Sequence, residues 1–521
     1  MRHLLLGPWP LRVLATVVTL IAAWLPLMPV LAPLIDLPKL ADVLDARTAG
    51  LLWQSLWMSA GSAIGAILLG GSFALLTVPF VFPGSGFLKL CLPLPLFLPP
   101  LMTAQAWFGL TGMSGPWATV FTFAVCYAPL PGLLVARALS LRPASSSASA
   151  ELMGPGFARG ELLRLGFLPA VTGGALVFLL AAADFAVPDY FATVGELFHV
   201  YAAEIFGHSR SDDAFAGATA SLPLVLLCLL VLAGAVLLRE KQRVQEVDAK
   251  DAAAPRPLGG GASALALGLG LALLALLFLL PLGRILWETG MQGPESTRSW
   301  MDVSGQAFQD AVTRGRGDIL RTLGYSGLAG LSCLAIAPIW AHALLHGSRR
   351  RRILLTIGLA LPLLVPSVAM GFGAIVVFNQ PWLDGFYRSI FLPALLVAGR
   401  FLPLAVILLA ERMARVSATG EEAAALSGMS YARRLFRIRL APQRGAWLLA
   451  GGLVLAFGMR ELDFAILLPA ANRSAAVRYY NALHFSRDNF VAAYGLVMAL
   501  ILFLPWVLAA AWGNLRQGKR P

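Results

Sequence analysis

The sequence predicts an all-α polytopic membrane protein with about 12 transmembrane helices, arranged as two parallel six-helix repeats. Of 521 residues, 58% are hydrophobic and 13% are charged, and the mean hydropathy is +0.76. A soluble domain carries about 25% charged residues. Apolar stretches of about 20 residues, enough to cross a bilayer, recur along the whole chain. Features of the first half also return in the second half in the same order.

The apolar stretches are separated by short connections. We expect spans at 13–34, 51–78, 88–110, 115–138, 169–190, 217–238, 263–286, 320–345, 353–378, 390–411, 444–468 and 491–513. The first stretch is longer than the apolar part of a secretory signal, about 7–15 residues, so we expect it to remain as a span. The four cysteines lie in apolar stretches without metal-ligand spacing, so they predict no metal site.

Basic residues gather in alternate connections, which predicts the orientation of the chain. The net charge is +13. The connections predicted to be cytoplasmic carry Arg137, Arg142, Arg159, Arg164, Arg239, Lys241, Arg243, Arg349 to Arg352, Arg412, Arg415, Arg433, Arg434, Arg437, Arg439 and Arg444. Because cytoplasmic loops collect Lys and Arg, both termini are expected in the cytoplasm, and the positive charge implies no nucleic-acid partner. The connection 287–319 is the exception, with three arginines on the predicted outer side.

A polar segment divides the chain into two halves of six predicted spans. Residues 241–262 are charged at first and then rich in Ala, Pro and Gly, which is typical of a flexible linker. The halves are 1–240 and 263–521. Corresponding features are Ser55-Leu56 and Thr322-Leu323, Pro95 to Pro99 and Pro362 to Pro366, Arg137 and Arg412, Gly156 and Gly428, Leu168 and Leu440, and Asp184-Phe185-Ala186 and Asp463-Phe464-Ala465. An even number of spans per unit makes such a repeat parallel.

The connection at 420–442 is more polar than the rest of the second half. It predicts a short helix, a left-handed cap at Gly428, and a second helix with Ser430 as its N-cap. Tyr431, Leu435 and Ile438 share one face of that second helix. By itself, this pattern also fits an interfacial helix lying on anionic lipid.

The connection at 145–169 has the same plan in the first half. If Gly156 is its central glycine, Leu168 and Pro169 fall in register with the second copy, and Glu151 stands one residue late. If Gly154 is central, the Leu-Pro pair comes two residues late. We favour Gly156, because its spacing to Leu168 equals that between Gly428 and Leu440.

These loops resemble the EAA loop of binding-protein-dependent ABC transporter permeases. That pattern is Glu-Ala-Ala, three residues, Gly, nine residues, Ile, any residue and Leu-Pro. The matching positions are Glu422, Ala423, Ala424, Gly428, Ile438 and Leu440, with the proline one residue late at Pro442. The two fused halves resemble the group of ferric iron and thiamine permeases.

The resemblance implies a function and a set of partners. The chain would be the permease of an importer in the bacterial inner membrane. Its loops would insert into two copies of a cytoplasmic ABC ATPase, with Tyr431 and Leu435 as anchors and the arginines fixing orientation. A periplasmic binding protein would deliver the solute, ferric iron first, with thiamine, a polyamine or a phosphonate as alternatives. No Gly-x-x-x-x-Gly-Lys-Ser/Thr motif occurs, so the chain is not expected to be an enzyme or to bind a cofactor, and ATP and Mg²⁺ would sit on the partner.

Four ionisable residues in or near the spans are candidates for the transport pathway or its gate. Asp184 and Asp463 correspond between the halves, Glu461 stands beside the latter, and Arg400 lies inside a predicted span. The alternative is that they form polar pairs between helices.

Two other classes of function compete with an ABC permease. A proton-driven carrier of two six-span halves is one, although such carriers often have a charged loop between spans two and three, and 79–87 has no charge. A membrane-embedded enzyme is the other. His342 and His346 are four residues apart, but no carboxylate lies between or beside them, so they predict no metalloenzyme motif.

Overall fold

The computed structural model describes residues 9–34, 45–210, 213–243, 252–292, 297–485 and 489–517, and helices make up nearly all of them. Among these residues, eight helices are long and apolar enough to cross a membrane, and two bent helix pairs raise the number to ten. The prediction of an all-α, multi-pass membrane protein is therefore confirmed. The eight are Trp9–Leu34, Ala46–Thr77, Gly115–Ser140, Pro155–Ala183, Ala214–Glu240, Gly260–Glu288, Trp300–His346 and Phe391–Met413.

The first half of the chain is a succession of helices with one short strand. Its elements are α2 (Trp9–Thr19), η1 (Leu20–Trp24), η2 (Leu25–Leu27), α3 (Met28–Leu31), η3 (Ala32–Leu34), α5 (Ala46–Thr77), β1 (Phe80–Val81), α6 (Ser85–Cys91), η4 (Leu94–Phe97), α7 (Pro100–Thr111), α8 (Gly115–Tyr127), α9 (Pro129–Ser140), α10 (Ala144–Leu152), α11 (Pro155–Ala183), α12 (Ala186–Val194), α13 (Tyr201–Gly207), η5 (His208–Arg210), α14 (Ala214–Ala220) and α15 (Leu222–Arg243).

The second half has the same character after one further strand. Its elements are β2 (Arg256–Pro257), α16 (Gly260–Leu274), η7 (Ala275–Leu279), α17 (Leu280–Glu288), α18 (Trp300–His346), α19 (Arg349–Leu364), α20 (Ser367–Phe378), η8 (Pro381–Leu383), α21 (Asp384–Tyr387), α22 (Phe391–Met413), α23 (Ala418–Leu426), α24 (Tyr431–Arg434), η9 (Leu435–Leu440), η10 (Ala441–Gln443), α25 (Arg444–Arg460), η11 (Ala465–Leu467), η12 (Ala470–Asn472), α26 (Ala475–Phe485) and α27 (Asn489–Gln517).

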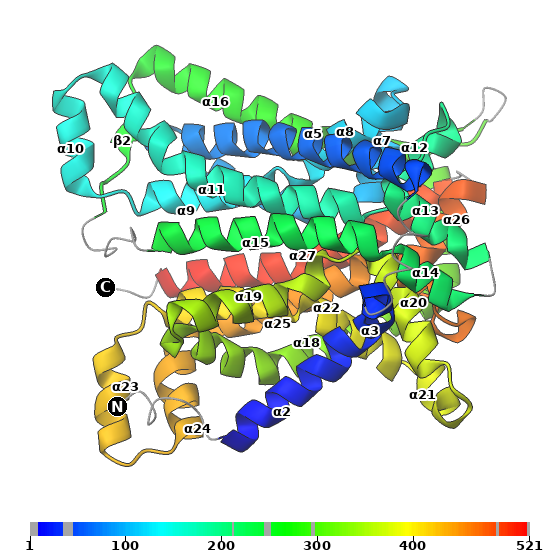
Figure 1. Cartoon of the computed structure of the whole chain (residues 1–521). Helices are drawn as coiled ribbons and strands as arrows, with labels where there is room; N and C mark the ends of the chain where they lie inside the picture. The colour runs from blue at the N-terminus through cyan, green and yellow to red at the C-terminus, as the bar shows by residue number, and fades with distance from the viewer. Residues whose placement is uncertain are drawn as a thin grey trace.

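The long helices lie side by side, and short helices cover the two ends of the bundle (Figure 1). We call the end that carries α10, α23 and α24 the basic end, and the end that carries α12, α13, α14 and α26 the far end. The two predicted loops thus lie at the same end of the molecule, on opposite sides of the bundle. The helix α2 begins, and α27 ends, toward the basic end.

A set of three mutually packed helices occurs in each half of the chain. In the first half α5, α9 and α11 contact one another, and in the second half α18, α22 and α25 do the same. The first apolar helix of each half lies against the other half. The segments η1 and η2 pack on α22 and α20, whereas α16 and α17 pack on α5 and α7.

Two hydrogen bonds repeat between the halves at positions that the sequence comparison paired. The Ser55 hydroxyl accepts a hydrogen bond from the Tyr201 backbone N–H at 2.8 Å. The Thr322 hydroxyl accepts one from the Ala475 backbone N–H, also at 2.8 Å. In each half this bond ties a long helix to the start of a short helix at the far end.

Each bent pair breaks at a proline that the sequence comparison also paired. The helices on either side of Pro99 meet at 100°, and those on either side of Pro366 meet at 90°. The preceding residues, Leu98 and Val365, are extended, with ψ of 126° and 144°. Proline disfavours the helical conformation of the residue before it, so the helix ends there.

Several predicted spans differ from the observed helices. The span expected at 169–190 ends at Ala183, and α18 begins at Trp300 rather than near residue 320. At about 1.5 Å per residue, the 47 residues of α18 are about 70 Å long, more than twice the apolar thickness of a bilayer. Much of the connection 287–319 is therefore a helical extension. The stretches 444–468 and 491–513 correspond to α25, with 17 residues, and to α27.

The end of the predicted linker is held in place rather than flexible. β2 pairs with β1, and Ala252 forms an isolated bridge with Pro143. The Arg142 guanidinium donates to the Ala254 carbonyl at 2.7 Å. These bonds tie the linker to the start of the first loop, while 244–251 lie outside the described residues.

Candidate functional site

The loop at 420–442 turns sharply at Gly428, as predicted. Its φ is +76°, a left-handed conformation that suits glycine. The Met429 N–H donates to the Ala424 carbonyl at 3.0 Å, and the Gly428 N–H to the Ala425 carbonyl at 3.1 Å. This Schellman cap ends α23 and fixes the direction of the chain into α24. Ser430 stands at the N-cap of α24, but its side chain makes no capping hydrogen bond.

The loop is anchored to the bundle by a buried carboxylate, Glu421, which sequence analysis did not single out. Its side chain is 1% exposed. Arg439 Nε donates to Glu421 Oε2 at 2.5 Å, and His342 Nε2 lies 2.7 Å from Oε1. The same arginine donates through Nη1 to the carbonyls of Met413 and Val416, at 3.1 and 2.6 Å, where α22 ends. One ion pair therefore fastens α23 to both α18 and α22.

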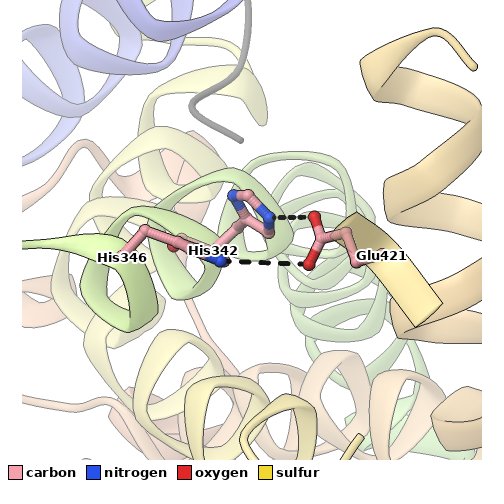
Figure 2. A group of neighbouring side chains, drawn as sticks. All are labelled: His342, His346 and Glu421. Atoms are coloured by element: carbon pink, nitrogen blue, oxygen red, sulfur yellow. Dashed lines mark hydrogen bonds and ion pairs between the residues drawn. The ribbon is translucent and has the colours of Figure 1, made fainter. Parts of the chain in front are cut away.

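Two histidines of α18 face this carboxylate (Figure 2). His346 Nε2 lies 3.9 Å from Glu421 Oε2, and the two imidazole rings are 4.3 Å apart. The Tyr431 ring meets His342 edge-on at 5.2 Å. No carboxylate lies near these two histidines in the sequence, but the fold places Glu421 of α23 beside them.

The charge of this carboxylate is maintained by its partners. Burial raises the pKa of Glu421, but hydrogen bonds and the charges of His342 and Arg439 outweigh burial and lower it to about 2. Glu421 is therefore ionised at neutral pH. The neighbouring Glu422, which was assigned to the Glu position of the EAA-like pattern, has a half-buried side chain.

The apolar face predicted to anchor a partner is instead packed against the chain itself. Tyr431 is 9% exposed and Leu435 is 2% exposed, and Leu440 is also buried. Tyr431 and Leu435, which were expected to anchor the loop in a partner groove, are therefore buried within this chain. The exposed apolar side chains of this loop are Leu426 at 69% and Phe436 at 47%.

A π-helical turn explains the late proline of the second loop. Residues Leu435–Leu440 form a π-helix, and a 3₁₀ turn with Pro442 follows before α25. A π-turn closes with i→i+5 hydrogen bonds and so takes in one residue more than an α-turn. Ile438 is half-buried in this turn, and Ala423 and Ala424 lie in α23.

The first loop bends at Gly154 rather than at Gly156. Gly154 has φ of +106°, whereas Gly156 is the second residue of α11. Leu168 and Pro169 lie within the same continuous helix. Glu151 forms an ion pair with Arg256 of the linker, a contact that sequence analysis missed. The large exposed apolar residues of this loop are Leu152, Met153, Phe157, Leu163 and Phe167.

The four pathway candidates all line one cavity of about 90 Å³ between the halves. About 10–15 Å³ of such volume holds one water molecule, so the cavity has room for several. Arg400 Nε lies 3.3 Å from Glu461 Oε2 and donates through Nη1 to the Val365 carbonyl at 2.9 Å. Arg460, which sequence analysis left out of its candidates, lines the same cavity and donates to the Leu96 carbonyl.

The two corresponding aspartates form no ion pair in the part of the chain that the structure describes, although Arg460 and Arg400 on the same cavity wall interact with their charges. Asp184 ends α11 and accepts a hydrogen bond from the Val187 N–H at 3.1 Å. Asp463 follows the end of α25. Both carboxylates belong to the cavity wall. Neither is involved in an ion pair among the described residues, whereas Glu461 is paired with Arg400.

Ion pairs join the two halves at the basic end. Glu411 at the end of α22 is paired with Arg137 of α9 and Arg239 of α15. Arg352 of α19 makes a bidentate pair with Glu240 of α15, at 2.7 and 2.5 Å. Sequence analysis recognised Arg137 as a repeated position but could not assign its partner.

No protein-family model matches this chain, and no curated protein matches it at a significant level.

Proposed function

We propose that the chain is the membrane permease of an ABC importer, with loops that receive the motion of separate ATPase subunits. The observation that carries the proposal is the second loop. It is a short helix pair with a fixed glycine bend, fastened to α18 and α22 by Glu421 and Arg439, and with exposed apolar side chains. A loop that is firmly attached to its own helix bundle and exposes apolar side chains to solvent can bind in a groove of a partner protein.

A duplicated architecture supports this proposal. The matching helix contacts, the exchange of the first helix between halves and the paired hydrogen bonds of Ser55 and Thr322 fit two six-span units related by an axis along the membrane normal. In this arrangement α25 and α27 are the eleventh and twelfth spans, and the basic end faces the cytoplasm of a bacterial cell. A second loop, α10 with Gly154, then faces a second copy of the ATPase.

The buried ion pair supplies a mechanical path from the loop to the bundle. Because Arg439 caps α22 and Glu421 contacts α18, a movement of α23 carries both helices with it. Arg400 lies on α22 and lines the cavity. ATP-driven movement of the loop would therefore change the cavity wall. The pairs of Glu411 and Glu240 would hold the basic end closed until the halves separate.

The charges of the cavity favour a cationic solute. Its wall carries three carboxylates, those of Asp184, Glu461 and Asp463, and two guanidinium groups. Two carboxylates without a direct ion pair are costly in an apolar bundle and are stabilised by a cation. Among the solutes expected from the sequence, ferric iron, thiamine and a polyamine fit this wall, and an anionic phosphonate fits it less well. A periplasmic binding protein would deliver the solute.

The same aspartates favour one second candidate, a proton-driven carrier. A buried carboxylate without a direct ion pair can take up and release a proton during transport. In that case a proton gradient would drive uptake without ATP, and the two loops would have no ATPase to contact.

Uptake into proteoliposomes distinguishes these functions. The chain is reconstituted with a candidate ABC ATPase and a candidate binding protein, and uptake is measured with ATP inside or with a proton gradient alone. Gly428→Asp should lower ATP-driven uptake at least about tenfold, because aspartate is strained at positive φ. Gly420→Asp is the matched control, since Gly420 lies in α23 with no atom near an added Cβ.

Two results would contradict the permease assignment. One is uptake by Gly428→Asp equal to that of Gly420→Asp at equal amounts of protein in the membrane. The other is full uptake from a proton gradient without ATP. The first loop provides a further comparison, because Gly154→Asp should impair uptake more than Gly156→Asp.

A further inference from the structure

We propose that His342, His346 and Glu421 form a binding site for a divalent transition-metal ion of the zinc type, between α18 and α23. The histidines are four residues apart and so lie on one face of α18. Their rings are 4.3 Å apart, and one ligand atom from each of the three side chains lies within 4.8 Å of the others. Figure 2 shows both rings directed toward the two carboxylate oxygens.

The hydrogen bond of His346 indicates that its second nitrogen is an electron-pair donor. Nδ1 of His346 lies 3.2 Å from the His342 backbone carbonyl. A carbonyl can only accept, so Nδ1 carries the hydrogen, and Nε2 of the neutral ring carries the lone pair. That lone pair faces Glu421 Oε2 at 3.9 Å, and the carboxylate oxygen is also an acceptor. Two acceptors that face each other in a largely buried site are stabilised by a cation between them.

The ligand atoms fit zinc better than magnesium or calcium. Two imidazole nitrogens and one carboxylate oxygen are a ligand set that catalytic and regulatory zinc sites use, whereas magnesium and calcium prefer oxygen alone. Zinc bonds to nitrogen and oxygen are about 2.0–2.2 Å, so two ligands of one ion are at most about 4.2 Å apart. His342 Nε2 lies 2.7 Å from Oε1 of the carboxylate and His346 Nε2 lies 3.9 Å from Oε2. One ligand atom from each side chain lies within 4.8 Å of the others, so small side-chain shifts bring all three to one ion.

The groups around the site would orient its ligands. The bond from His346 Nδ1 to a backbone carbonyl is the outer-shell contact that metal-binding histidines usually make. Arg439 holds the carboxylate from the other side, and its positive charge makes the site weaker than a closed structural zinc site. The His346 side chain is 15% exposed, which leaves a route for the ion and an open coordination position. Binding would displace the proton that lies between His342 and Glu421.

An ion at this position would add a second fastening between the loop and α18. Glu421 already connects α23 to α22 through Arg439. With the ion bound, α23 would also be bonded to the last turn of α18. The binding itself does not depend on the proposed transport function.

Metal binding can be measured on the full chain. It is purified through an affinity tag that contains no histidine, and a chelator then removes any bound metal. After addition of Zn²⁺ and gel filtration, we expect about one Zn²⁺ per chain and a cleavage rate by trypsin at the loop arginines at least about tenfold lower. His346→Ala should lose both effects while keeping the bond between Arg439 and Glu421. His199→Ala is the matched control, because His199 is exposed and outside the site, and it should keep both.

Three results would overturn the proposal. The first is equal Zn²⁺ content in the unchanged chain and in His346→Ala. The second is Zn²⁺ bound without any protection of the loop. The third is protection at acidic pH without metal and no further protection by Zn²⁺, which would mean that a proton joins the two acceptors. Because none of these measurements involves uptake, they are independent of the test of the permease.

Discussion

Replacing Glu421 with alanine removes the acid that fastens the second loop to the bundle. The change leaves Arg439 and His342 in place, and their side chains are 4% and 1% exposed. Arg439 keeps its bonds to the carbonyls of Met413 and Val416 but has no counter-ion. Breaking a buried ion pair by removing one partner costs about 3–5 kcal/mol.

This cost predicts how often the loop opens. At about 1.4 kcal/mol for each tenfold change, the open population rises about 100- to 4000-fold if the whole cost falls on the closed loop. Trypsin reports the open state, because Arg433 and Arg437 are exposed but lie in a short helix and a π-turn that resist cleavage while folded. When opening is fast, the cleavage rate follows the open population.

The first loop provides a matched control for this substitution. Glu151→Ala removes an ion pair with Arg256, but its side chain is 50% exposed. Exposed pairs contribute about 0–1 kcal/mol, so cleavage of the first loop should change less than about fivefold. The double change Glu421→Leu with Arg439→Leu should recover part of the resistance, because no unpaired charge then remains buried.

Equal cleavage rates for Glu421→Ala and the unchanged chain would refute this reasoning. So would a double variant that is cleaved faster than Glu421→Ala, because the cost would then not come from an unpaired charge.

Three further predictions concern the linker, the exposed apolar surface and the paired hydroxyls. Arg256→Ala should raise hydrogen exchange in α10, because it removes the ion pair to Glu151. Phe436→Asp should lower co-purification of the ATPase at least about tenfold with no change in thermal stability, since Phe436 is exposed. Ser55→Ala and Thr322→Val each remove the hydroxyl and little else, so each should lower the free energy of unfolding by about 1 kcal/mol through the loss of a buried hydrogen bond, and unchanged stability of only one of the two variants would contradict their equivalence.

The helices, caps and breaks that depend on residues close together in the sequence could be predicted from the sequence. Apolar stretches identified the long helices, and Gly428 was recognised because a helix followed by glycine favours a left-handed cap. The breaks at Pro99 and Pro366 follow from the restriction that proline places on the residue before it. Each of these features is determined within a few residues of the chain.

Spacing alone misplaced the bend of the first loop. In the second loop two residues, Met429 and Ser430, separate Gly428 from the start of α24 at Tyr431, whereas α11 starts directly after Gly154. The first loop therefore has two residues fewer in its turn and four more between the start of its helix and the leucine. A count from glycine to leucine cannot tell a turn residue from a helix residue, so it selected Gly156.

Periodicity identified the apolar face of the second loop but not what that face contacts. Tyr431 and Leu435 do share a face, and that face packs on the bundle. An apolar face of this kind is needed both for binding a partner protein and for packing on the chain's own helices. The pattern therefore does not distinguish the two. The cluster around Glu421 could not be found in this way, because 79 residues separate it from His342 and 18 from Arg439.

The two loops are attached to the bundle by different means, and this bears on how each would transmit force. The second loop is fastened through buried charges to two long helices, α18 and α22. The first is held through exposed Glu151 to the linker, which is tied to the bundle by backbone pairing at β1. An exposed pair yields more easily than a buried one. In the proposed permease, a displacement of α23 would therefore be passed to the cavity wall with less loss than one of α10.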